Sequence, residues 1–386
     1  MRFALTMLVL LAACGVGERR LPIEDWDQLP ACVRRSALFA FDTLGAPGSS
    51  WWSPDPEIEA EAARDVKGAS PAQFVEALQH RDRHVRYGAV WAAGTLGPDA
   101  QSLLPALFEA CNDKSLHVQC AASVSLGRIG PAALAELIAA LRRGEPLSWA
   151  HMNFAFVSMD RPTAILATKA LVPLLSEDDV ALRQRTIYAL RALREGAREA
   201  VPELLRILES GEPRCRNAAA WCLASVGPRD ARIISPLVSA LEHAITEQGA
   251  RHALIWVGEP ARPALIATLQ SDSRRGRLNA ARVLATFEDS GPALPVLLRA
   301  LEGSNADDAK SALSGLGSMG SKAEPAIPKL IALLGHRQLG QRASWTLGAI
   351  GAPAVPALTD ACWTLDSTRR AHAWWALKRA VRRALS

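Results

Sequence analysis

The sequence is poor in the features that mark enzymes, metal proteins and β-sheet folds. Aromatic residues make up only 5% of its 386 residues, and clusters of Val, Ile and Thr of the kind found in strands are scarce. No Cys-x-x-Cys pair, His-Glu-x-x-His motif, Walker-type phosphate loop or Gly-x-Ser-x-Gly elbow occurs, so the usual signs of zinc sites, ATPases and serine hydrolases are missing. Ala and Leu dominate instead, within a hydrophobic content of 49%. This composition favours closely packed helices over sheets.

The sequence also has no large excess of positive or negative charge. The formal net charge is +5 and the pI is near 8.9, whereas nucleic-acid-binding domains usually carry a stronger basic excess on one face. We therefore expect a mixed, solvated surface. Nucleic acid is not an expected partner, and no cofactor is expected.

The N-terminus carries the one apolar segment that stands out. Arg2 precedes an apolar run over 3–11, which is too short to span a bilayer but suits the apolar region of a signal peptide. The following Leu11-Ala12-Ala13-Cys14 resembles the lipobox of bacterial lipoproteins, in which the peptidase cuts before the Cys and the thiol receives the lipid. We predict a signal peptide over 1–13, lipidation at Cys14 and a tether over 14–30. A plain secretory signal is the alternative.

This resemblance implies a protein of the cell envelope, held to a membrane through its N-terminal lipid. Residue 15 is Gly rather than the Asp that resembles an inner-membrane retention signal in enterobacteria. The outer membrane is therefore the preferred expectation.

The six cysteines after Cys14 offer little for disulfides. Cys215 and Cys222 are seven residues apart on one expected helix, and a rise of 1.5 Å per residue separates their Cα atoms by roughly 10 Å, too far for a bridge. Cys111 and Cys120 flank a turn and could pair, on weaker grounds. Buried free thiols are the main expectation.

One sequence motif, called here the first phrase, recurs along the chain about every 30 residues. It starts with a short apolar residue, often followed by Arg, continues with Ala, and ends on Leu-Gly-x-apolar-Gly or a close variant. The apolar positions fall at i, i+4, i+7, i+8 and i+11, which is one face of a helix. The closing Gly can adopt the left-handed backbone that ends a helix. Clear copies occupy 85–97, 118–130, 215–227, 250–258, 277–284, 316–320 and 343–351.

A second sequence motif, called here the second phrase, follows the first. It consists of Pro and a stretch of aliphatic residues that is expected to form a helix. Pro suits the first turn of a helix, where its missing N–H costs nothing. Each repeat therefore consists of a first helix, a turn with Gly and a second helix. The copies of the second phrase contain Pro105, Pro202, Pro236, Pro263, Pro295, Pro328 and Pro356.

This pattern resembles HEAT repeats, in particular the bacterial kind also seen in phycobilin lyases, over roughly residues 30–385. The resemblance implies an all-α solenoid of about ten two-helix repeats with an extended concave surface. It also implies that second helices line the concave side. Exposed candidates there are Glu203, Arg206, Arg299 and Lys329.

Three stretches depart from the regular pattern. A divergent first repeat over 31–80 has its second helix expected over 71–78. It contains an insertion, 46–70, that holds Trp51 and Trp52, and this insertion is either a binding loop or a shield for the first repeat. Within the regular solenoid, 81–386, the stretch 149–159 replaces Ala with aromatic residues and Met, which favours a repacked core over a binding patch. The C-terminal segment 369–386 is expected to be a charged capping helix, with a contact to anionic lipid or nucleic acid as the alternative.

Tryptophan recurs at one position of the first phrase. On a helical wheel this position points away from the stripe that meets the second helix. The rings therefore either wedge between successive repeats, which we favour, or are exposed as anchors for a partner. The residues at this position are Phe39, Trp91, Trp221, Trp345 and Trp375. The Trp residues among them are candidate binding residues, together with Trp51 and Trp52.

The remaining motifs that resemble cofactor or metal sites lack the sequence context that such sites need. Gly315–Gly320 matches Gly-x-Gly-x-x-Gly, but it lies at the end of an expected helix rather than after a strand. His80 and His84 lie at an expected turn and have no Glu between them, which indicates a turn rather than a metal site. The HEAT-repeat deoxyhypusine hydroxylases use His-Glu pairs, and none of the eight histidines here precedes a Glu. No catalytic or metal-binding residue is predicted.

The function expected from the sequence is a membrane-tethered scaffold that binds a protein partner on its concave surface. One alternative is a nucleic-acid-binding protein similar to the HEAT-like DNA glycosylases, which would need a continuous Arg stripe. The other is an enzyme of the bilin-lyase type, which would need a polar pocket in the groove.

Overall fold

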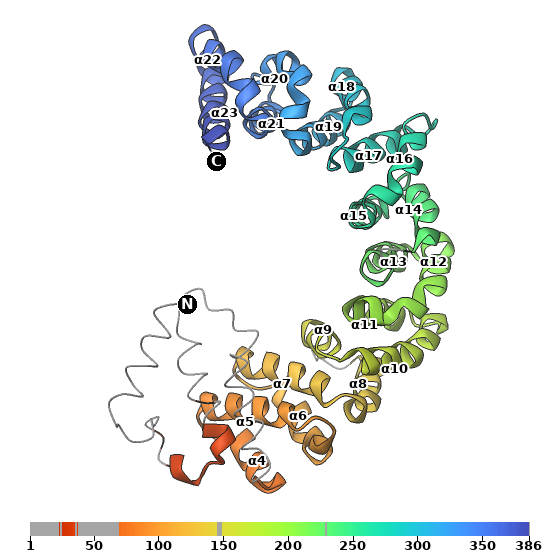
Figure 1. The fold of residues 1–386 in the computed structure, drawn as a ribbon, viewed down its shortest axis with the longest axis vertical. Coiled ribbons are helices and arrows are strands. Elements are labelled where there is room, and N and C mark those ends of the chain that lie inside the picture. Colours follow the sequence, from red (N-terminus) through yellow and green to blue (C-terminus); the bar gives the residue numbers. More distant parts are fainter. Residues whose placement is uncertain are drawn as a thin grey trace. The chain divides into compact units, whose positions relative to one another are not determined.

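The computed structural model describes residues 23, 25–34, 37, 69–144, 149–227 and 230–385. Cys14, Phe39, Trp51 and Trp52 lie outside the described residues, as does nearly all of the insertion 46–70. The described part of the chain contains helices and no strand (Figure 1), and none of its helices has the length and apolar character needed to cross a membrane. The chain divides into two compact units, Met1–Ser176 and Glu177–Ser386, called unit 1 and unit 2 below and described separately.

Unit 1 alternates first and second helices as the sequence predicts. The second helix of the divergent first repeat is α4, and its bounds coincide with the segment 71–78 expected to pack on it. First helices α5, α7 and α9 follow one another, and each packs on its neighbour in the series. The helices are α4 (Pro71–Leu78), α5 (Arg83–Thr95), α6 (Leu104–Ala110), α7 (Leu116–Ile129), α8 (Pro131–Arg143), α9 (Trp149–Val157) and α10 (Arg161–Leu171).

Unit 2 continues the alternation up to a final unpaired helix. Its first helices are α11 (Val180–Leu193), α13 (Pro213–Val226), α15 (Glu247–Val257), α17 (Arg274–Leu284), α19 (Ala306–Met319), α21 (Gly340–Ile350) and α23 (Ser367–Leu385). Its second helices are α12 (Val201–Ser210), α14 (Ile234–Ala240), α16 (Arg262–Thr268), α18 (Leu294–Glu302), α20 (Ile327–Leu333) and α22 (Val355–Thr364).

Unit 2, taken by itself, curves with its first helices on the inner side and its second helices on the outer side (Figure 1). The expectation that second helices line the concave side is therefore wrong for this unit. The cause is the small side chains of the first helices, which let successive first helices pack closely, whereas successive second helices touch much less. At Gly249, for example, an added Cβ would lie only 2.9 Å from the Cβ of Ala220. The closely packed side of a stack becomes its shorter, concave side.

Local sequence explains where the helices begin and end. Asp82, Asp160, Asp179 and Asn305 are N-caps whose side chains accept hydrogen bonds from backbone N–H groups of the first turn. The predicted proline-started helices are confirmed, with Pro in the first turn of α6, α12, α16, α18, α20 and α22. The glycines that close first helices have positive φ, as predicted, at Gly130, Gly258, Gly320 and Gly351. The prediction is wrong for Gly227, which closes α13 with a φ of −139°.

An Arg near the start of the first helix is used inside the fold in five of the repeats. Its guanidinium donates to a backbone carbonyl just before its own helix, in the connecting loop or, for Arg216, in the last turn of the preceding helix, where carbonyls are left open. The bonds run from Arg86 to His80 (2.9 Å), Arg183 to Glu177 (2.8 Å), Arg216 to Leu208 (2.9 Å), Arg277 to Ser271 (2.6 Å) and Arg370 to Leu365 (3.0 Å). These five arginines therefore do not form a free basic surface.

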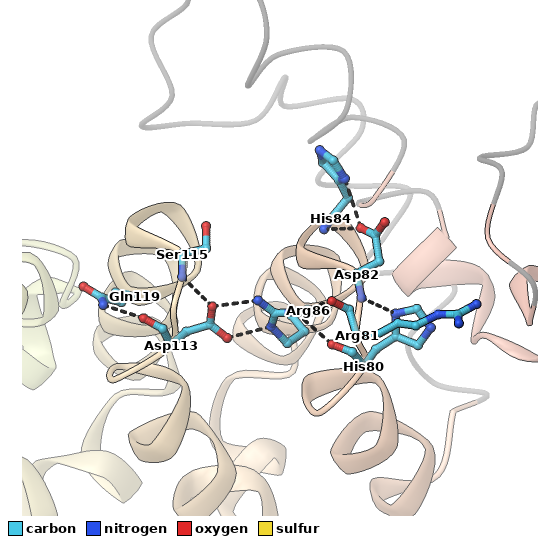
Figure 2. A network of polar contacts seen from close by, with 8 residues as sticks. All are labelled: His80, Arg81, Asp82, His84, Arg86, Asp113, Ser115 and Gln119. Carbon is cyan, nitrogen blue, oxygen red and sulfur yellow. Dashed lines mark hydrogen bonds and ion pairs between the residues drawn. The ribbon is translucent and has the colours of Figure 1, made fainter.

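Arg86 also joins two successive repeats of unit 1 (Figure 2). Its Nε and Nη2 donate to the two carboxylate oxygens of Asp113 at 2.6 and 2.9 Å, a bidentate pair of the strong kind. The backbone N–H of Ser115 donates to the same carboxylate at 2.7 Å. Burial pushes the pKa of Asp113 upward, but the bonds from Arg86 and Ser115 and the charge of Arg86 outweigh it and hold that pKa below its ordinary value.

His80 lies in the turn between α4 and α5, as predicted, and His84 lies in the first turn of α5 (Figure 2). His80 Nε2 lies 3.0 Å from Asp25 Oδ1, and the backbone N–H of Asp82 donates to His80 Nδ1 at 3.0 Å. His84 Nδ1 lies 3.0 Å from the carboxylate of the N-cap Asp82. Each ring thus has a place in the hydrogen bonding of the turn.

The six cysteines of the described residues are buried and free, as mainly expected. The weaker alternative, a bridge between Cys111 and Cys120, is not formed. Cys111 Sγ instead lies 3.7 Å from the hydroxyl of Ser123, and burial raises the pKa of the Cys111 thiol to about 12. In the irregular stretch 149–159, Met152 and Phe156 are buried, in agreement with the predicted local core.

Candidate binding face on the first helices of unit 2

The recurring tryptophans lie between successive first helices. The Arg128 guanidinium on α7 lies 4.6 Å from the centre of the Trp91 ring on α5. Trp221 on α13 meets His252 on α15 with ring centres 4.3 Å apart. These contacts show the inter-repeat packing that the sequence analysis favoured.

Packing and exposure differ from one of these rings to the next. Trp91 is only 4% exposed and is packed beside Tyr87, so it lies in the core of unit 1 and not on a binding surface. Trp221 is half-buried. Trp345 and Trp375 are 50% and 39% exposed although they pack on each other, so these two both join repeats and face solvent.

Trp345, Trp375 and Arg379 form a cluster at the C-terminal end of unit 2, called here the tryptophan–arginine cluster. The two ring centres are 5.1 Å apart, and the guanidinium carbon of Arg379 lies 4.5 Å from the Trp345 ring centre and 4.9 Å from that of Trp375. The glycine at 348 permits this approach, because a Cβ there would lie 2.9 Å from the Cβ of Arg379. Cation–π contacts of this kind are worth about 0.5–1 kcal/mol each at exposed sites.

A hollow of about 410 Å³ adjoins this cluster. Its walls come from three successive first helices, α19, α21 and α23. They contain two arginines and no carboxylate. The lining residues are Leu313, Ser314, Gly317, Gln341, Arg342, Trp345, Thr346, Ala349 and Arg379.

A second group of charges lies in the middle of unit 2, on α15 and α17. Burial and, to a lesser extent, the charge of Arg251 lower the pKa of Arg282 to about 10, against the opposing effect of Glu247. Glu247 accepts hydrogen bonds from Arg275 at 2.8 Å and from the amide of Asn279 at 3.0 Å, so one carboxylate serves several donors. Arg251 Nε is buried without a hydrogen-bond partner. This part of the inner face therefore holds positive charge that the fold does not fully neutralise.

Other charges on these first helices are paired. Lys310 lies 2.8 Å from Asp307, and Arg274 lies 2.5 Å from Asp308. For Arg342 and Arg379, the described residues offer no carboxylate within ion-pair distance. Two cations without a carboxylate partner among the described residues, Arg342 and Arg379, thus meet at the hollow.

Several exposed tryptophans are not among the binding residues predicted from the sequence. Trp256 on α15 is 72% exposed, and it lies one helical turn after His252, on the same side of the helix. A helical wheel extended by one turn would have found it. Trp374 on α23 and Trp363 on the second helix α22 are also exposed, and no feature of the repeat predicts them.

Comparison with known proteins supports the fold. The family model of HEAT repeats matches residues 71–148 and 168–257, so these stretches are HEAT repeats. With the helix order given above, the match confirms the predicted fold class, an all-α solenoid of about ten two-helix repeats. No curated protein sequence matches the chain.

Among solved structures, the karyopherin Kap121p is similar in fold. Its complexes with the extreme C-terminus of the protein phosphatase Cdc14p and with the SUMO protease Ulp1p each align with a TM-score of 0.50 at 15% sequence identity. Each alignment covers 86% of this chain and 44% of the karyopherin chain. The chain thus spans less than half of the length of these karyopherins, and the similarity concerns the fold alone.

Proposed function

We propose that this protein is a protein–protein interaction scaffold, tethered to a membrane through a lipid on Cys14, which binds its partner on the inner, first-helix face of unit 2. The observation that carries the proposal is the exposure of four tryptophans on first helices, each between 39% and 72% exposed: Trp256, Trp345, Trp374 and Trp375. Trp is costly to leave in water, and it is enriched among the residues that dominate binding energy at interfaces.

Two further observations support the binding part of this proposal. Repeats that contact only their neighbours build long surfaces suited to extended partners. Kap121p, which has the same fold, is seen in complex with the C-terminus of Cdc14p and with Ulp1p. A solenoid of this kind can therefore hold segments of other proteins.

A site-specific crosslinking experiment tests the binding face. A photoreactive amino acid is placed at Ser314, exposed on first helix α19, and as a matched control at Thr359, exposed on second helix α22. We expect discrete adducts, identified by mass spectrometry, from position 314 only, and their loss when Trp345→Ala is added. The same adducts from both positions, or adducts that ignore Trp345→Ala, would show that this face is not the binding surface.

The tether is tested separately by fractionation. Wild type and Cys14→Ala are expressed in a Gram-negative host with a labelled fatty acid, and inner and outer membranes are separated. We expect label and outer-membrane association for the wild type only. If both proteins are unlabelled and stay in the cytoplasm, the lipoprotein proposal is wrong.

The nucleic-acid alternative has less support, because five of the repeat arginines donate to backbone carbonyls within the fold. Salt-dependent retention on DNA would revive it. The lyase-like alternative would need a polar pocket on this face. The hollow beside the tryptophan–arginine cluster is partly polar, but none of its lining residues is a His, Asp, Glu, Cys or Lys that could act as a general acid or base.

A further inference from the structure

The hollow beside the tryptophan–arginine cluster has an unbalanced charge. Arg342 and Arg379 both line it, and no Asp or Glu does. The hydroxyl of Thr346 is turned away from a ligand, since it donates to the backbone carbonyls of Leu313 and Arg342 at 3.0 and 2.9 Å. The groups left for a ligand are therefore mainly donors, which select for an acceptor that carries negative charge.

The stacking of Arg379 also favours a planar anion. Its guanidinium carbon lies 4.5 Å from the Trp345 ring centre and 4.9 Å from that of Trp375, so both rings contact the group, while the residue as a whole is exposed. Arginine binds the two oxygens of a carboxylate in a bidentate geometry. The two rings hold the group in place, so little side-chain entropy is lost on binding.

The hollow also has apolar walls. Leu313, Gly317, Ala349 and the half-exposed ring of Trp345 provide contact area beside the arginines. A volume of about 410 Å³ exceeds the need of a single ion and lies in the range of small-ligand pockets. An acidic side chain with a neighbouring residue of a peptide fills such a site better than inorganic phosphate does.

We infer that this hollow is a subsite for an acidic side chain, Asp or Glu, within an extended segment of the protein partner. The inference rests on the proposed function, which gives this face a protein partner, and it adds the chemistry that the partner presents. A nucleic acid fits less well, because other cations on the first helices, Arg274 and Lys310, are already paired with Asp308 and Asp307. Arg251 and Arg282 on α15 and α17 do carry charge that is not fully neutralised, but both side chains are half-buried rather than exposed to a phosphate backbone.

The test measures binding of fluorescein-labelled octaglutamate by anisotropy at low salt, with octaglutamine as the uncharged control. We expect octaglutamate to bind and octaglutamine to bind at least tenfold more weakly. Arg342→Gln and Arg379→Gln should each weaken octaglutamate binding about tenfold, the loss typical of one charge-assisted contact. Arg299→Gln, which makes the same charge change on second helix α18, should alter it less than twofold.

Arg342→Lys distinguishes carboxylate recognition from attraction by charge alone. It keeps the charge and loses the planar fork, so we expect only partial recovery of affinity relative to Arg342→Gln. Full recovery, or equal weakening by Arg299→Gln, would overturn the carboxylate site. Circular dichroism verifies that each variant stays folded; these arginines are exposed, so their loss should not unfold the chain.

Two competitors identify other ligands. Inorganic phosphate and single-stranded oligothymidylate of eight nucleotides are titrated against the labelled peptide. Competition by the oligonucleotide at equal or lower concentration than unlabelled octaglutamate would overturn the peptide inference in favour of nucleic acid. If octaglutamate fails to bind but crosslinks from Ser314 remain specific, the carboxylate inference alone is wrong. If both fail, the proposed binding face is wrong.

Discussion

Trp91 in unit 1 and Trp345 in unit 2 occupy the same position of the repeat, and each lies under an arginine of the next first helix. The distances agree closely, at 4.6 Å to Arg128 and 4.5 Å to Arg379. Yet Trp91 is 4% exposed and Trp345 is 50% exposed. Tyr87 packs beside the first ring, whereas a hollow with small residues lies beside the second. A repeat position is therefore core or surface according to what its neighbours add.

The largest expected effect is the loss of stability on removal of the Trp91 ring, compared with removal of the Trp345 ring. Trp91→Ala should reduce the free energy of unfolding by about 3–5 kcal/mol, as for other large buried aromatics. Trp345→Ala should reduce it by only about 1–2 kcal/mol, since half of that ring is already in water. Hydrogen exchange of α5 and α7, compared with α21 and α23, measures both changes locally. Equal losses would mean that the two rings play the same structural part.

A second contrast concerns the glycine of the Leu-Gly pair in two first helices. An added Cβ at Gly127 in unit 1 would lie 2.1 Å from the carbonyl oxygen of Ala155, whereas at Gly317 in unit 2 its nearest neighbour is the Cβ of Ala349 at 3.9 Å. Gly127→Ala should therefore destabilise by about 2–3 kcal/mol through overpacking. Gly317→Ala should stabilise by about 0.5–1 kcal/mol, because Ala suits a helix interior better than Gly does. Denaturant midpoints of the two variants give the signs, and a destabilised Gly317→Ala would contradict the packing described.

The ion pair of unit 1 predicts a dependence on pH. The pKa of Asp113 is lowered in the folded state, so its carboxylate adds stability above its unfolded pKa of about 3.9, and this is lost as pH falls through the lower folded pKa. Asp113→Asn should cost about 1–2 kcal/mol at pH 7 and should flatten the loss of stability below about pH 4. Unfolding curves at pH 7, 4 and 3 test this. A variant that matches the wild type at pH 7 would show that the pair adds nothing.

The smallest expected effect is a gain in stability, and it comes from a substitution in the middle of unit 2. Because the pKa of Arg282 falls to about 10 in the folded state, its charge opposes folding in full below about pH 10, and this cost shrinks as the pH rises from that value toward the ordinary pKa of arginine. Arg282→Met keeps most of the stem and removes the charge, so it should stabilise the protein on the order of 1 kcal/mol after allowance for solvent screening. Arg275→Met, which breaks the pair with Glu247, is the control and should not stabilise.

The fold was predictable because its signals are local and repeated. Proline in the first turn, Asp or Asn before it and glycine after it fix helix bounds one turn at a time. The match of α4 to the predicted 71–78 follows from such signals. The concave side was predicted wrongly, because curvature depends on how closely whole rows of helices pack and not on any one helix.

The candidate site was predictable only in part. Trp345 and Trp375 were found because they repeat in register, but Trp91 at the same position is buried and Trp256 one turn away is exposed. Arg342 and Arg379 carried no signal of their own, since arginine recurs throughout the chain and several copies donate to backbone carbonyls instead. The position of Arg379 depends in part on Trp345, which lies on the preceding first helix, 34 residues away in the sequence.

The sequence by itself determined the helices, their order and the all-α repeat, because period, caps and turn residues act within a few residues of one another. The tertiary structure alone decided which helix row is concave, which tryptophans are covered and which arginines lack a carboxylate. These properties arise from contacts between successive repeats, where the size of one side chain sets the exposure and charge environment of another about 30 residues away.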